Sequence, residues 1–530
     1  MKRRLVSLIL AVIAILSLSG CAEFLPGELD NYDIVTSPPP SPTPPIVIPS
    51  QTAKSELFGL GYNPNVTMNP YTDTNSLNQQ LYSLMYDTLF MLDLNLCPQY
   101  SLCEDYTVSS DNTVYTLTLR DDAHFHDGSA LTAVDVVYSI DQAKKDGSIY
   151  SSRLAYILSA KASGDHTVVI TLNSPLGYFT SLLDFPIVKN KSVNNKNPEG
   201  TGAYFIYSDD EDTYLSYNSY WWKSTPSAYR IELIPCNSAD SLLSEFESGF
   251  ISLTTSDFTG TYAINYSTNH EVYSYPTTTM QYIGYNISNP LLSKAEVRRM
   301  ISSIIDREYI SKSILSGYAK SANIPISPAS PAYSSISENE DIDELLEAAG
   351  IKDYDSDGKL EYYVSSRKYE DVTFTLLVNN ENSRKVEIAN YIKTRLEDLG
   401  IAVTVKSVNF SAYQTALSSL SFDMYIAETA LYANFDFSKL IKTDGALNFG
   451  KYTNPEFDSK LNEFLSYNSE LLYNHYADDF YKLFVKEQPI TVICFKDHST
   501  LVRRGVVKNY SGTYHNAFFD FANWTIADYN

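Results

Sequence analysis

The chain reads YTLTLRDDAHFHDGSALTAVDV from residue 115 to residue 136, and this stretch decides the fold class. From Tyr115 to Leu119, apolar residues alternate with threonines, which is the period-two pattern of a β-strand. Further on, Thr132 is followed three residues later by Asp135, a variant of the capping box that opens a helix. The predicted order is therefore strand, loop, helix.

A second pattern of strand, helix and strand lies between Asp371 and Asn409. Apolar residues alternate from Val372 to Leu376 and again from Ile401 to Val405. Between them, Ser383 is expected to cap a helix whose apolar positions fall on one face and which ends at Gly400. Such a βαβ unit predicts parallel strands joined by a right-handed crossover.

The length of the chain indicates more than one folding unit. About 480 residues follow the N-terminal segment, which is more than one hydrophobic core normally supports. Together with the two patterns above, this length predicts an α/β protein with at least two lobes. The formal net charge of -24 argues against nucleic acid as a partner, because phosphates are repelled by an acidic surface.

The N-terminal segment has the pattern of an exported, lipid-anchored protein. Three cations precede an apolar run from Leu5 to Leu18, which predicts a signal peptide over residues 1–20. The sequence Leu-Ser-Gly-Cys that ends at Cys21 resembles the bacterial lipobox, in which the cysteine receives a diacylglyceryl group. Residues 21–54 include a proline-rich tract that is expected to form an extended stalk. The expected location is the extracytoplasmic face of the cell membrane.

Sequence signatures of catalysis and metal binding are few. The chain has neither a G-x-S-x-G nucleophile elbow nor an H-E-x-x-H zinc motif, so we expect no enzyme and no cofactor. The acidic turn from Asp353 to Gly358 resembles the start of a calcium loop, but Val364 stands where the closing glutamate should be, and no metal site is expected. Cys97 and Cys103 flank a turn sequence and are a candidate disulfide in an oxidising compartment.

The stretch from Tyr115 to Val136 resembles the signature of the family 5 extracellular solute-binding proteins, the peptide and nickel group. In that signature a strand ending in Leu-Arg precedes Phe-His-Asp-Gly, which is followed by Leu-Thr-Ala and a helix. Further family-like blocks keep the family's order: Gly200–Tyr204, Asn218–Trp221, Gly284–Asn286, Ile305–Glu308, Phe422–Met424 and Asn454–Asp458. The resemblance covers about residues 55 to 510.

This resemblance implies a two-lobed periplasmic-binding-protein type II fold with an extra subdomain in the first lobe. The boundaries that it implies are a first lobe over residues 55–280 with the subdomain at about 90–195, a second lobe over 281–485, and a return to the first lobe over 486–530. A monomer would enclose its ligand between the lobes and deliver it to an ABC permease in the membrane. The leading ligand is a short peptide, whose backbone could pair with a strand.

Peptide-binding members of the family place an aspartate for the peptide ammonium in a loop after the Phe-Asp-Met segment. In this chain, Glu428, Asn434 and Asp436 occupy that region and are the candidate ligand-binding residues of the second lobe. Asn69 and Tyr71 are the candidates from the first lobe. Asp436 has a second interpretation, in which it only caps the helix that follows it.

The ligand and the biological role have alternatives on the sequence. Within the same fold, a nickel chelate or a sugar-type ligand would require histidines or stacked tryptophans in the cleft. An extracellular peptide sensor or receptor that signals through a partner would need the same closure as a transport protein. The sequence motifs are mostly structural, so they predict the class of protein rather than its ligand.

Overall fold

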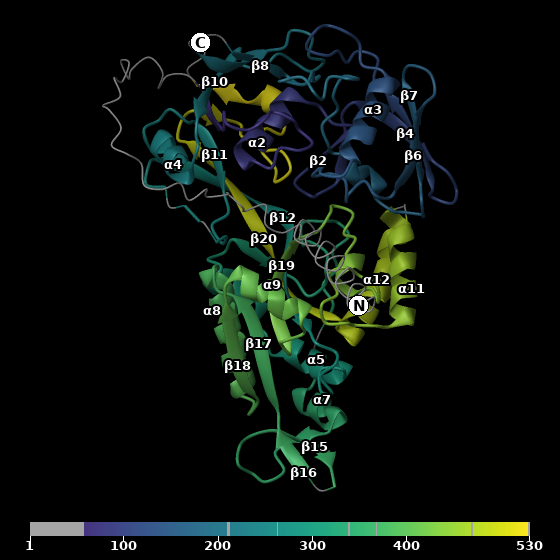
Figure 1. The fold of residues 1–530 in the computed structure, drawn as a ribbon, viewed down its shortest axis with the longest axis vertical. Helices are drawn as coiled ribbons and strands as arrows, with labels where there is room; N and C mark the ends of the chain where they lie inside the picture. Colours follow the sequence, from purple (N-terminus) through teal and green to yellow (C-terminus); the bar gives the residue numbers. More distant parts are fainter. Residues whose placement is uncertain are drawn as a thin grey trace, which may run out of the picture.

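The computed structural model describes residues 58–208, 212–261, 263–264, 266–337, 340–366, 368–467 and 470–527. The predicted signal peptide, Cys21 and the predicted stalk over residues 21–54 lie outside the described residues. The described chain forms two lobes, one above the other in Figure 1, which share a large β-sheet. We call the part that holds β1 the first lobe and the part that holds β17 the second lobe.

The large sheet continues through both lobes because two long antiparallel strands cross between them. These strands are β12 (His270–Tyr285) and β20 (Ile490–Arg503). In the first lobe the sheet continues through β11 (Leu253–Ser256), β1 (Gly59–Tyr62), β10 (Arg230–Pro235), β9 (Thr213–Tyr217) and β8 (Tyr204–Ser208). In the second lobe it continues through β19 (Met424–Ala430), β17 (Thr373–Asn379) and β18 (Ala402–Val408), and β13 (Ala319–Ser321) pairs with β20.

The first lobe also carries a smaller antiparallel sheet of order β4-β5-β7-β6. Its strands are β4 (Cys103–Val108), β5 (Val114–Leu119), β7 (Thr167–Leu172) and β6 (Ile157–Ala162). The alternating residues predicted as a strand form β5, whose burial alternates along the strand. Helix α3 (Ala133–Ala143) follows Thr132, whose backbone N–H and hydroxyl both donate to the carboxylate of Asp135. The predicted order of strand, loop and capped helix is confirmed.

The predicted βαβ unit is present in the second lobe. β17 and β18 pair in parallel and flank helix α8 (Ser383–Glu397). The N-cap of α8 is Asn382, so the predicted cap at Ser383 was wrong by one residue. Oδ1 of Asn382 accepts hydrogen bonds from two backbone N–H groups of the first turn, while its Nδ2 donates to the carbonyl of Thr259 at 3.0 Å. A carboxamide can cap and donate at once, which favours asparagine at this position.

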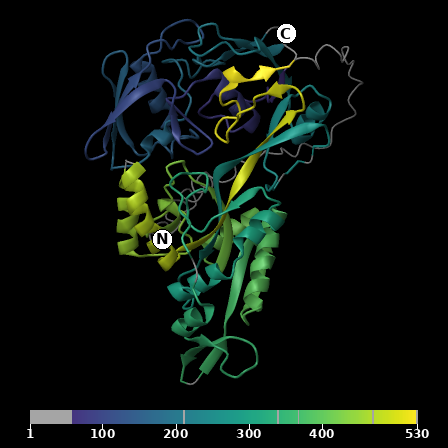
Figure 2. The same cartoon turned by 180° about the vertical axis from the view of Figure 1, so that it is seen from behind.

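Helices and short strands complete both lobes. The first lobe contains α2 (Ser76–Met85), α4 (Ala239–Glu247), β2 (Phe90–Leu92), β3 (Pro98–Tyr100), β21 (Val507–Lys508), β22 (Thr525–Ile526) and 3-10 turns at Phe179–Leu182 and Phe521–Asn523. The second lobe contains α5 (Ala295–Ser303), α6 (Arg307–Tyr309) with a π-turn at Ile310–Ile314, α7 (Ile342–Ala349), β14 (Ile351–Lys352), β15 (Glu361–Ser365), β16 (Lys368–Asp371), α9 (Phe410–Ser418), α10 (Ser438–Ile441), α11 (Pro455–Ser466) and α12 (Glu470–Glu487). Figure 2 shows the yellow C-terminal segment back on the first lobe. None of the helices in the described residues has the length and apolar character needed to span a bilayer.

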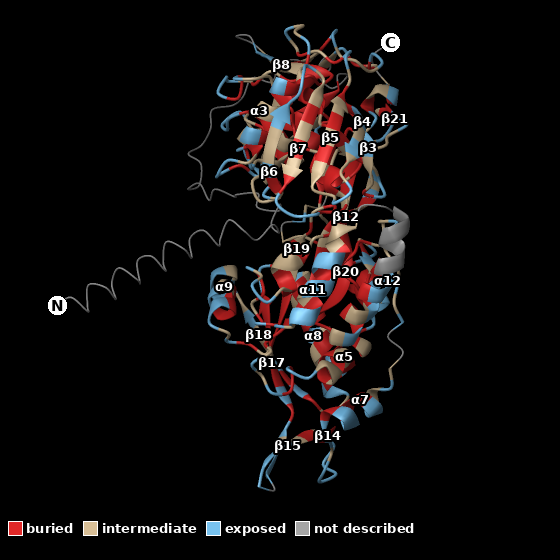
Figure 3. Ribbon diagram, turned by 90° about the vertical axis from the view of Figure 1, so that its right-hand side faces the viewer, coloured by how far each residue is buried: buried red, intermediate tan, exposed pale blue. Residues whose placement is uncertain are grey.

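Each lobe has its own hydrophobic core. Buried residues such as Phe58, Phe185 and Trp524 form the main cluster of the first lobe, and separate clusters form in the second lobe. Figure 3 shows this division as buried strands inside each lobe and exposed residues at the surface. Leu96, in the turn between β2 and β3, is an exception because it packs into a second-lobe cluster. Separate cores allow lobes to move as units about the strands that connect them.

The pairing of β12 with β20 is irregular where the strands pass from lobe to lobe. The register shifts between Pro276 and Met280. Within this stretch, Oγ1 of Thr277 donates to the carbonyl of Lys496 at 2.7 Å and accepts from the N–H of Thr279 at 2.8 Å. A bulge bends a strand and interrupts its ladder of hydrogen bonds. The two crossing strands therefore have a natural point of bending.

Candidate ligand-binding seam between the lobes

Strand directions bring the carboxyl ends of the parallel strands of both lobes face to face. β20 runs from the second lobe to the first, and β11 pairs antiparallel with it, so β11 ends toward the second lobe. β1 and β10 run parallel to β11 and therefore end on the same side. β12 runs from the first lobe to the second, and β19 pairs antiparallel with it, so β19 ends toward the first lobe. β17 and β18 run parallel to β19 and therefore end on the same side. Ligands of open α/β sheets bind outside the carboxyl ends of the strands. We call the region between the two edges the seam, and it is the candidate site.

Four charged side chains meet where the seam reaches the crossing strands, and we call them the hinge cluster: Asp257, Lys385, Glu428 and Lys496. Nζ of Lys496 lies 3.2 Å from Oε1 of Glu428 and also pairs with the carboxylate of Asp257. Nζ of Lys385 lies 3.6 Å from Oε2 of Glu428. All four side chains are at most 10% exposed. Because Asp257 follows β11 while Glu428 lies on β19, the cluster joins the two lobes.

Burial and charge act in opposite directions on Glu428. Burial raises the pKa of its carboxyl, but Lys385 and Lys496 outweigh that effect and hold the pKa below its usual value. The amide of Gln281 also donates to Oε2 of Glu428 at 2.8 Å. Burial lowers the pKa of the nearby His498 to about 4, so this imidazole is neutral at pH 7. Glu428 lies at the seam, as a carboxylate whose charge two lysines already compensate.

A small cavity of about 40 Å³ lies beside the hinge cluster in the second lobe. Its lining includes Asn379, Lys385 and Glu428 together with aromatic side chains such as Tyr413 and Phe449. Apolar walls with a few polar groups are typical of ligand pockets, although complete pockets are several times larger.

Further along the seam, Asp436 contacts the first lobe. The hydroxyl of Tyr156 donates to Oδ2 of Asp436, and the hydroxyl of Tyr432 donates to Oγ of Ser152 at 2.7 Å. Oδ1 of Asp436 accepts from the backbone N–H of Ser438, the first residue of α10, at 2.8 Å. Burial, followed by the charge of Asp436, raises the pKa of Tyr156, so its hydroxyl keeps its proton. Both carboxylate oxygens of Asp436 are thus engaged.

Asn434 lies in the same second-lobe loop as Asp436. Its side chain is buried, and Oδ1 accepts from the backbone N–H of Asp436 at 3.3 Å. Among the described residues, no hydrogen-bond partner reaches its Nδ2. The loop therefore holds one buried amide donor that has no partner in the described part of the chain.

Asn69 and Tyr71 lie in a turn of the first lobe. The side chain of Asn69 accepts from the N–H of Tyr71 at 2.9 Å, and its Nδ2 donates to the carbonyl of Val193 at 3.3 Å. Tyr71 is 2% exposed, and its hydroxyl donates to the carbonyl of Pro186 at 2.8 Å. These contacts hold the turn against the first-lobe core. A ligand-binding role for the two residues stays a prediction.

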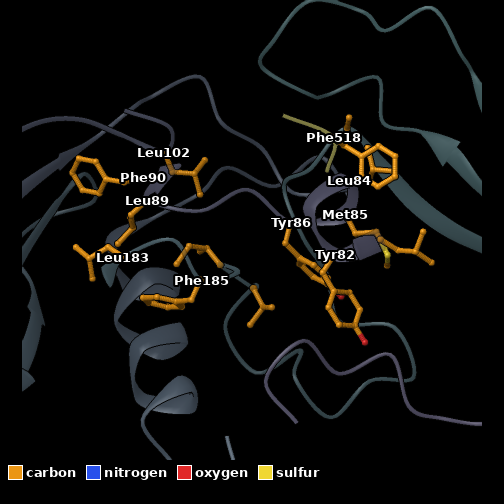
Figure 4. Close-up of a cluster of buried hydrophobic side chains, with 14 of the residues drawn as sticks. Tyr82, Leu84, Met85, Tyr86, Leu89, Phe90, Leu102, Leu183, Phe185 and Phe518 are labelled. Atoms are coloured by element: carbon orange, nitrogen blue, oxygen red, sulfur yellow. The ribbon is translucent and has the colours of Figure 1, made fainter. Parts of the chain in front are cut away.

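Three functional candidates of the first lobe carry no sequence signal of their own. Nη1 of Arg153 lies 2.7 Å from Oδ1 of Asp184, and Nδ1 of His515 lies 3.1 Å from the other oxygen of Asp184. Asp184 and His515 also line a cavity of about 120 Å³, with Tyr82, Tyr86 and Phe518 in its wall. Figure 4 shows Tyr82 and Tyr86 together at the end of α2, with Phe518 drawn near Leu84. The residues of this group are far apart in the chain, so a local motif could not identify them.

Two further predictions concern the cysteines and the acidic turn. Cys103 is a buried free cysteine whose thiol donates to the carbonyl of Asp105 at 3.2 Å, so this structure holds no Cys97–Cys103 disulfide. Formation of that disulfide after export stays a prediction. In the acidic turn, the carboxylates of Asp353, Asp355, Asp357 and Glu361 lie within 4.8 Å of one another. Backbone N–H groups of the turn donate to Asp353, so hydrogen bonds within the turn stabilise it.

Comparisons with known proteins agree with the geometry. Residues 98–441 match the model of the bacterial extracellular solute-binding proteins, family 5 middle region. The chain is 25% identical over 472 residues to the oligopeptide-binding protein AppA of Bacillus subtilis (81% of this chain, 84% of that protein). It is 24% identical over 441 residues to the periplasmic murein peptide-binding protein MppA of Escherichia coli (74% and 79%).

A solved structure shows the same fold. The crystal structure of a nickel ABC transporter protein from Bacillus halodurans superposes with a TM-score of 0.71 at 18% identity, covering 87% of this chain and 98% of that one. The predicted fold class is confirmed: α/β, with two lobes of the periplasmic-binding-protein type II. At this identity the likeness concerns the fold alone.

Proposed function

This chain belongs to the bacterial extracellular solute-binding proteins of family 5, and we propose that it captures short peptides between its two lobes and delivers them to an ABC permease. The family resemblance inferred from residues 115–136 is thereby confirmed. The proteins of this family bind substrates outside the cytoplasm. We propose that this chain has no catalytic activity of its own.

The observation that carries this function is the seam. The parallel strands of both lobes end there, the charged hinge cluster lies there, and two bent strands connect the lobes. Closure about such strands encloses a ligand, and the closed form is the one that a permease recognises. Support for peptides comes from the relatives, whose names specify oligopeptides and murein peptides. Main-chain hydrogen bonds would give affinity for many peptide sequences.

We also propose that Cys21 carries a lipid and that residues 21–54 hold a monomeric body beside the permease. A tether raises the local concentration of a binding protein next to its membrane partner. The proposed boundaries are residues 55–280 with a subdomain at about 90–195, residues 281–485, and residues 486–530. Replacing Cys21 by Ser should release the protein from membranes into the soluble fraction. Retention of the variant on membranes would contradict the lipid anchor.

The test of peptide binding is a calorimetric titration with a library of di- to pentapeptides. Nickel–histidine complexes and oligosaccharides are titrated in parallel, since members of this fold accept different ligands. We expect heat of binding with peptides and none with the sugars. Heat with the nickel complexes or the sugars alone would overturn the peptide assignment while leaving the solute-binding class intact.

A further inference from the structure

Helix α11 of the second lobe ends against the first lobe. The last carbonyl groups of a helix have no donor within the helix itself. Two of them receive donors from the first lobe. The backbone N–H of Gly177 donates to the carbonyl of Leu465 at 2.6 Å, and Nδ2 of Asn112 donates to the carbonyl of Ser466 at 3.1 Å. The C-terminus of α11 is therefore capped across the seam.

Side chains interlock around these two hydrogen bonds. Leu465 packs against the main cluster of the first lobe, and Tyr178 packs against a second-lobe cluster. Figure 1 shows α11 below the small sheet of the first lobe and to one side of the crossing strands, and Figure 2 shows the same arrangement from behind. This contact between the lobes is thus separate from the strands that connect them. We call its residues the clasp: Asn112, Gly177, Tyr178, Leu465, Ser466 and Tyr467.

Gly177 allows the two backbones to approach this closely. A methyl group added at its Cα would lie 1.7 Å from the carbonyl oxygen of Tyr467 and 3.2 Å from that of Leu465. The three heavy atoms nearest to such a methyl group all belong to the second lobe. The φ angle of Gly177 also lies outside the left-handed region that favours glycine. The first lobe therefore accommodates alanine at position 177, whereas the clasp does not.

Asn112 reaches α11 from the turn between β4 and β5. Its φ angle is 55°, a left-handed conformation that asparagine and glycine tolerate. Its backbone N–H donates to the carbonyl of Ser109 at 2.9 Å, which closes the turn without the side-chain amide. Glycine at position 112 would therefore keep the turn and remove the donor to α11.

The clasp contributes to the closed form alone. Its two hydrogen bonds join one lobe to the other, so they are lost when the lobes separate. None of its residues lines either of the two cavities described above. The apparent affinity for a ligand that needs the closed form rises with the fraction of the protein that is closed. The clasp can thus change affinity from a place that lies outside these cavities.

We infer, on the premise from the proposed function that the lobes close on a ligand, that the clasp sets the balance between the open and closed forms. It thereby scales the affinity for every ligand by the same factor. Residues that contact the ligand change the ranking of ligands, whereas the clasp leaves the ranking as it is. The small sheet of the first lobe regulates capture in this way through α11.

Gly177→Ala tests the inference in the full-length protein. Without added peptide, small-angle X-ray scattering should give a larger radius of gyration than for the wild type, because the methyl group clashes with Tyr467 in the closed form. Calorimetry with an acidic, a basic and an apolar tripeptide should give affinities at least about fivefold weaker, by factors that agree within about twofold. An unchanged radius or unchanged affinities would overturn the inference. A loss confined to one tripeptide would do the same.

Asn112→Gly keeps the inference testable if Gly177→Ala fails to fold. It removes one of the two hydrogen bonds, so it should weaken binding of all three tripeptides by one factor that is smaller than for Gly177→Ala. An unchanged affinity in this variant would count against the clasp.

Gly164→Asn is the matched control in the same small sheet. Gly164 lies in the turn between β6 and β7 with a φ angle of 81°, which asparagine tolerates. Apart from its chain neighbours, no atom of the described residues lies within 4 Å of a methyl group added there. The control should keep the radius and the affinities of the wild type. A loss of affinity equal to that of Asn112→Gly would show that the effect does not come from the clasp.

The outcomes for the inference and for the proposed function are distinct. If the wild type and both clasp variants bind the tripeptides equally well, the proposed function stands and the inference falls. If the wild type binds no peptide, the proposed function falls, and the radius of gyration decides the inference. A larger radius in Gly177→Ala then supports the clasp, and equal radii overturn it.

Discussion

At the scale of single residues, the role of a buried carboxylate depends on its partners. The carboxylate of Glu428 pairs with Lys385 and with Lys496. Its charge therefore stabilises the contact between the two lobes. Removal of one member of a buried ion cluster leaves the remaining charges without compensation, which costs far more than loss of an exposed pair. The hinge cluster therefore contributes to folding as well as to the seam.

Glu428→Gln should lower the free energy of unfolding by about 3 kcal/mol, because the buried Lys385 and Lys496 would both lose the carboxylate charge with which they pair. Urea unfolding measures the change. The matched control is Glu308→Gln, whose partner Lys312 lies 2.7 Å away in an exposed pair. The control should leave the unfolding midpoint unchanged. Equal midpoints for Glu428→Gln and the wild type would contradict the role of the cluster.

His498 predicts a pH dependence of stability. Its pKa is lowered from 6.5 to about 4 by burial, so below pH 6.5 the unfolded chain takes up a proton that the folded protein refuses. Stability is therefore lost as the pH falls from 6.5 to 4, by up to roughly 3 kcal/mol from this group. His498→Gln should lose less stability than the wild type between pH 7 and pH 4.5. The same loss in both proteins would show that His498 is not responsible.

Sequence patterns can identify the types of site residue but not their partners. The family pattern directs attention to Glu428, which lies on β19, and to Asp436 in the segment after this strand; both lie at the seam, and their binding of a ligand stays a prediction. The lysines that compensate Glu428 and the tyrosine that binds Asp436 come from other elements, up to 280 residues away. Such pairings depend on the arrangement of the strands. For the same reason, Arg153 and its partners could not be predicted.

At the scale of elements, local patterns were sufficient where local physics decides the structure. The capped helix α3 and the βαβ unit of β17, α8 and β18 follow from side-chain periodicity and capping chemistry. The cap of α8 was misassigned by one residue, because Asn382 and Ser383 are both good caps and the contact with Thr259 decides between them. The two long crossing strands, β12 and β20, are stabilised by pairing with each other. The hydrophobic periodicity of either strand alone does not reveal this pairing.

Asn382 has two roles, capping α8 and contacting Thr259 of the first lobe, and two substitutions can separate them. Asn382→Ala should destabilise the protein by about 1 kcal/mol, because two N–H groups of α8 lose their acceptor. Asn382→Asp keeps an acceptor at the helix N-terminus, so its unfolding free energy should match the wild type. The carboxylate cannot donate to the carbonyl of Thr259, so the aspartate variant should be more open in small-angle X-ray scattering. Equal destabilisation of the two variants would contradict this division of roles.

At the scale of the whole molecule, two lobes with separate cores meet at a seam and share two bent strands. Several contacts across the seam are polar, namely the hinge cluster, Asn382 with Thr259, and Tyr156 with Asp436, while Leu96 adds an apolar contact between the lobes. Polar interfaces of this kind open more readily than apolar ones. A ligand that bridges the lobes shifts the population toward the closed form by its extra affinity for that form.

The central claim is that the protein closes on a peptide. Small-angle X-ray scattering of the full-length protein, with and without a saturating peptide from the calorimetric library, tests it most directly. We predict that the radius of gyration falls when the peptide is added, and that Glu428→Gln, with its weakened link between the lobes, starts from a larger value. A peptide that binds while the radius of gyration stays constant would contradict the account.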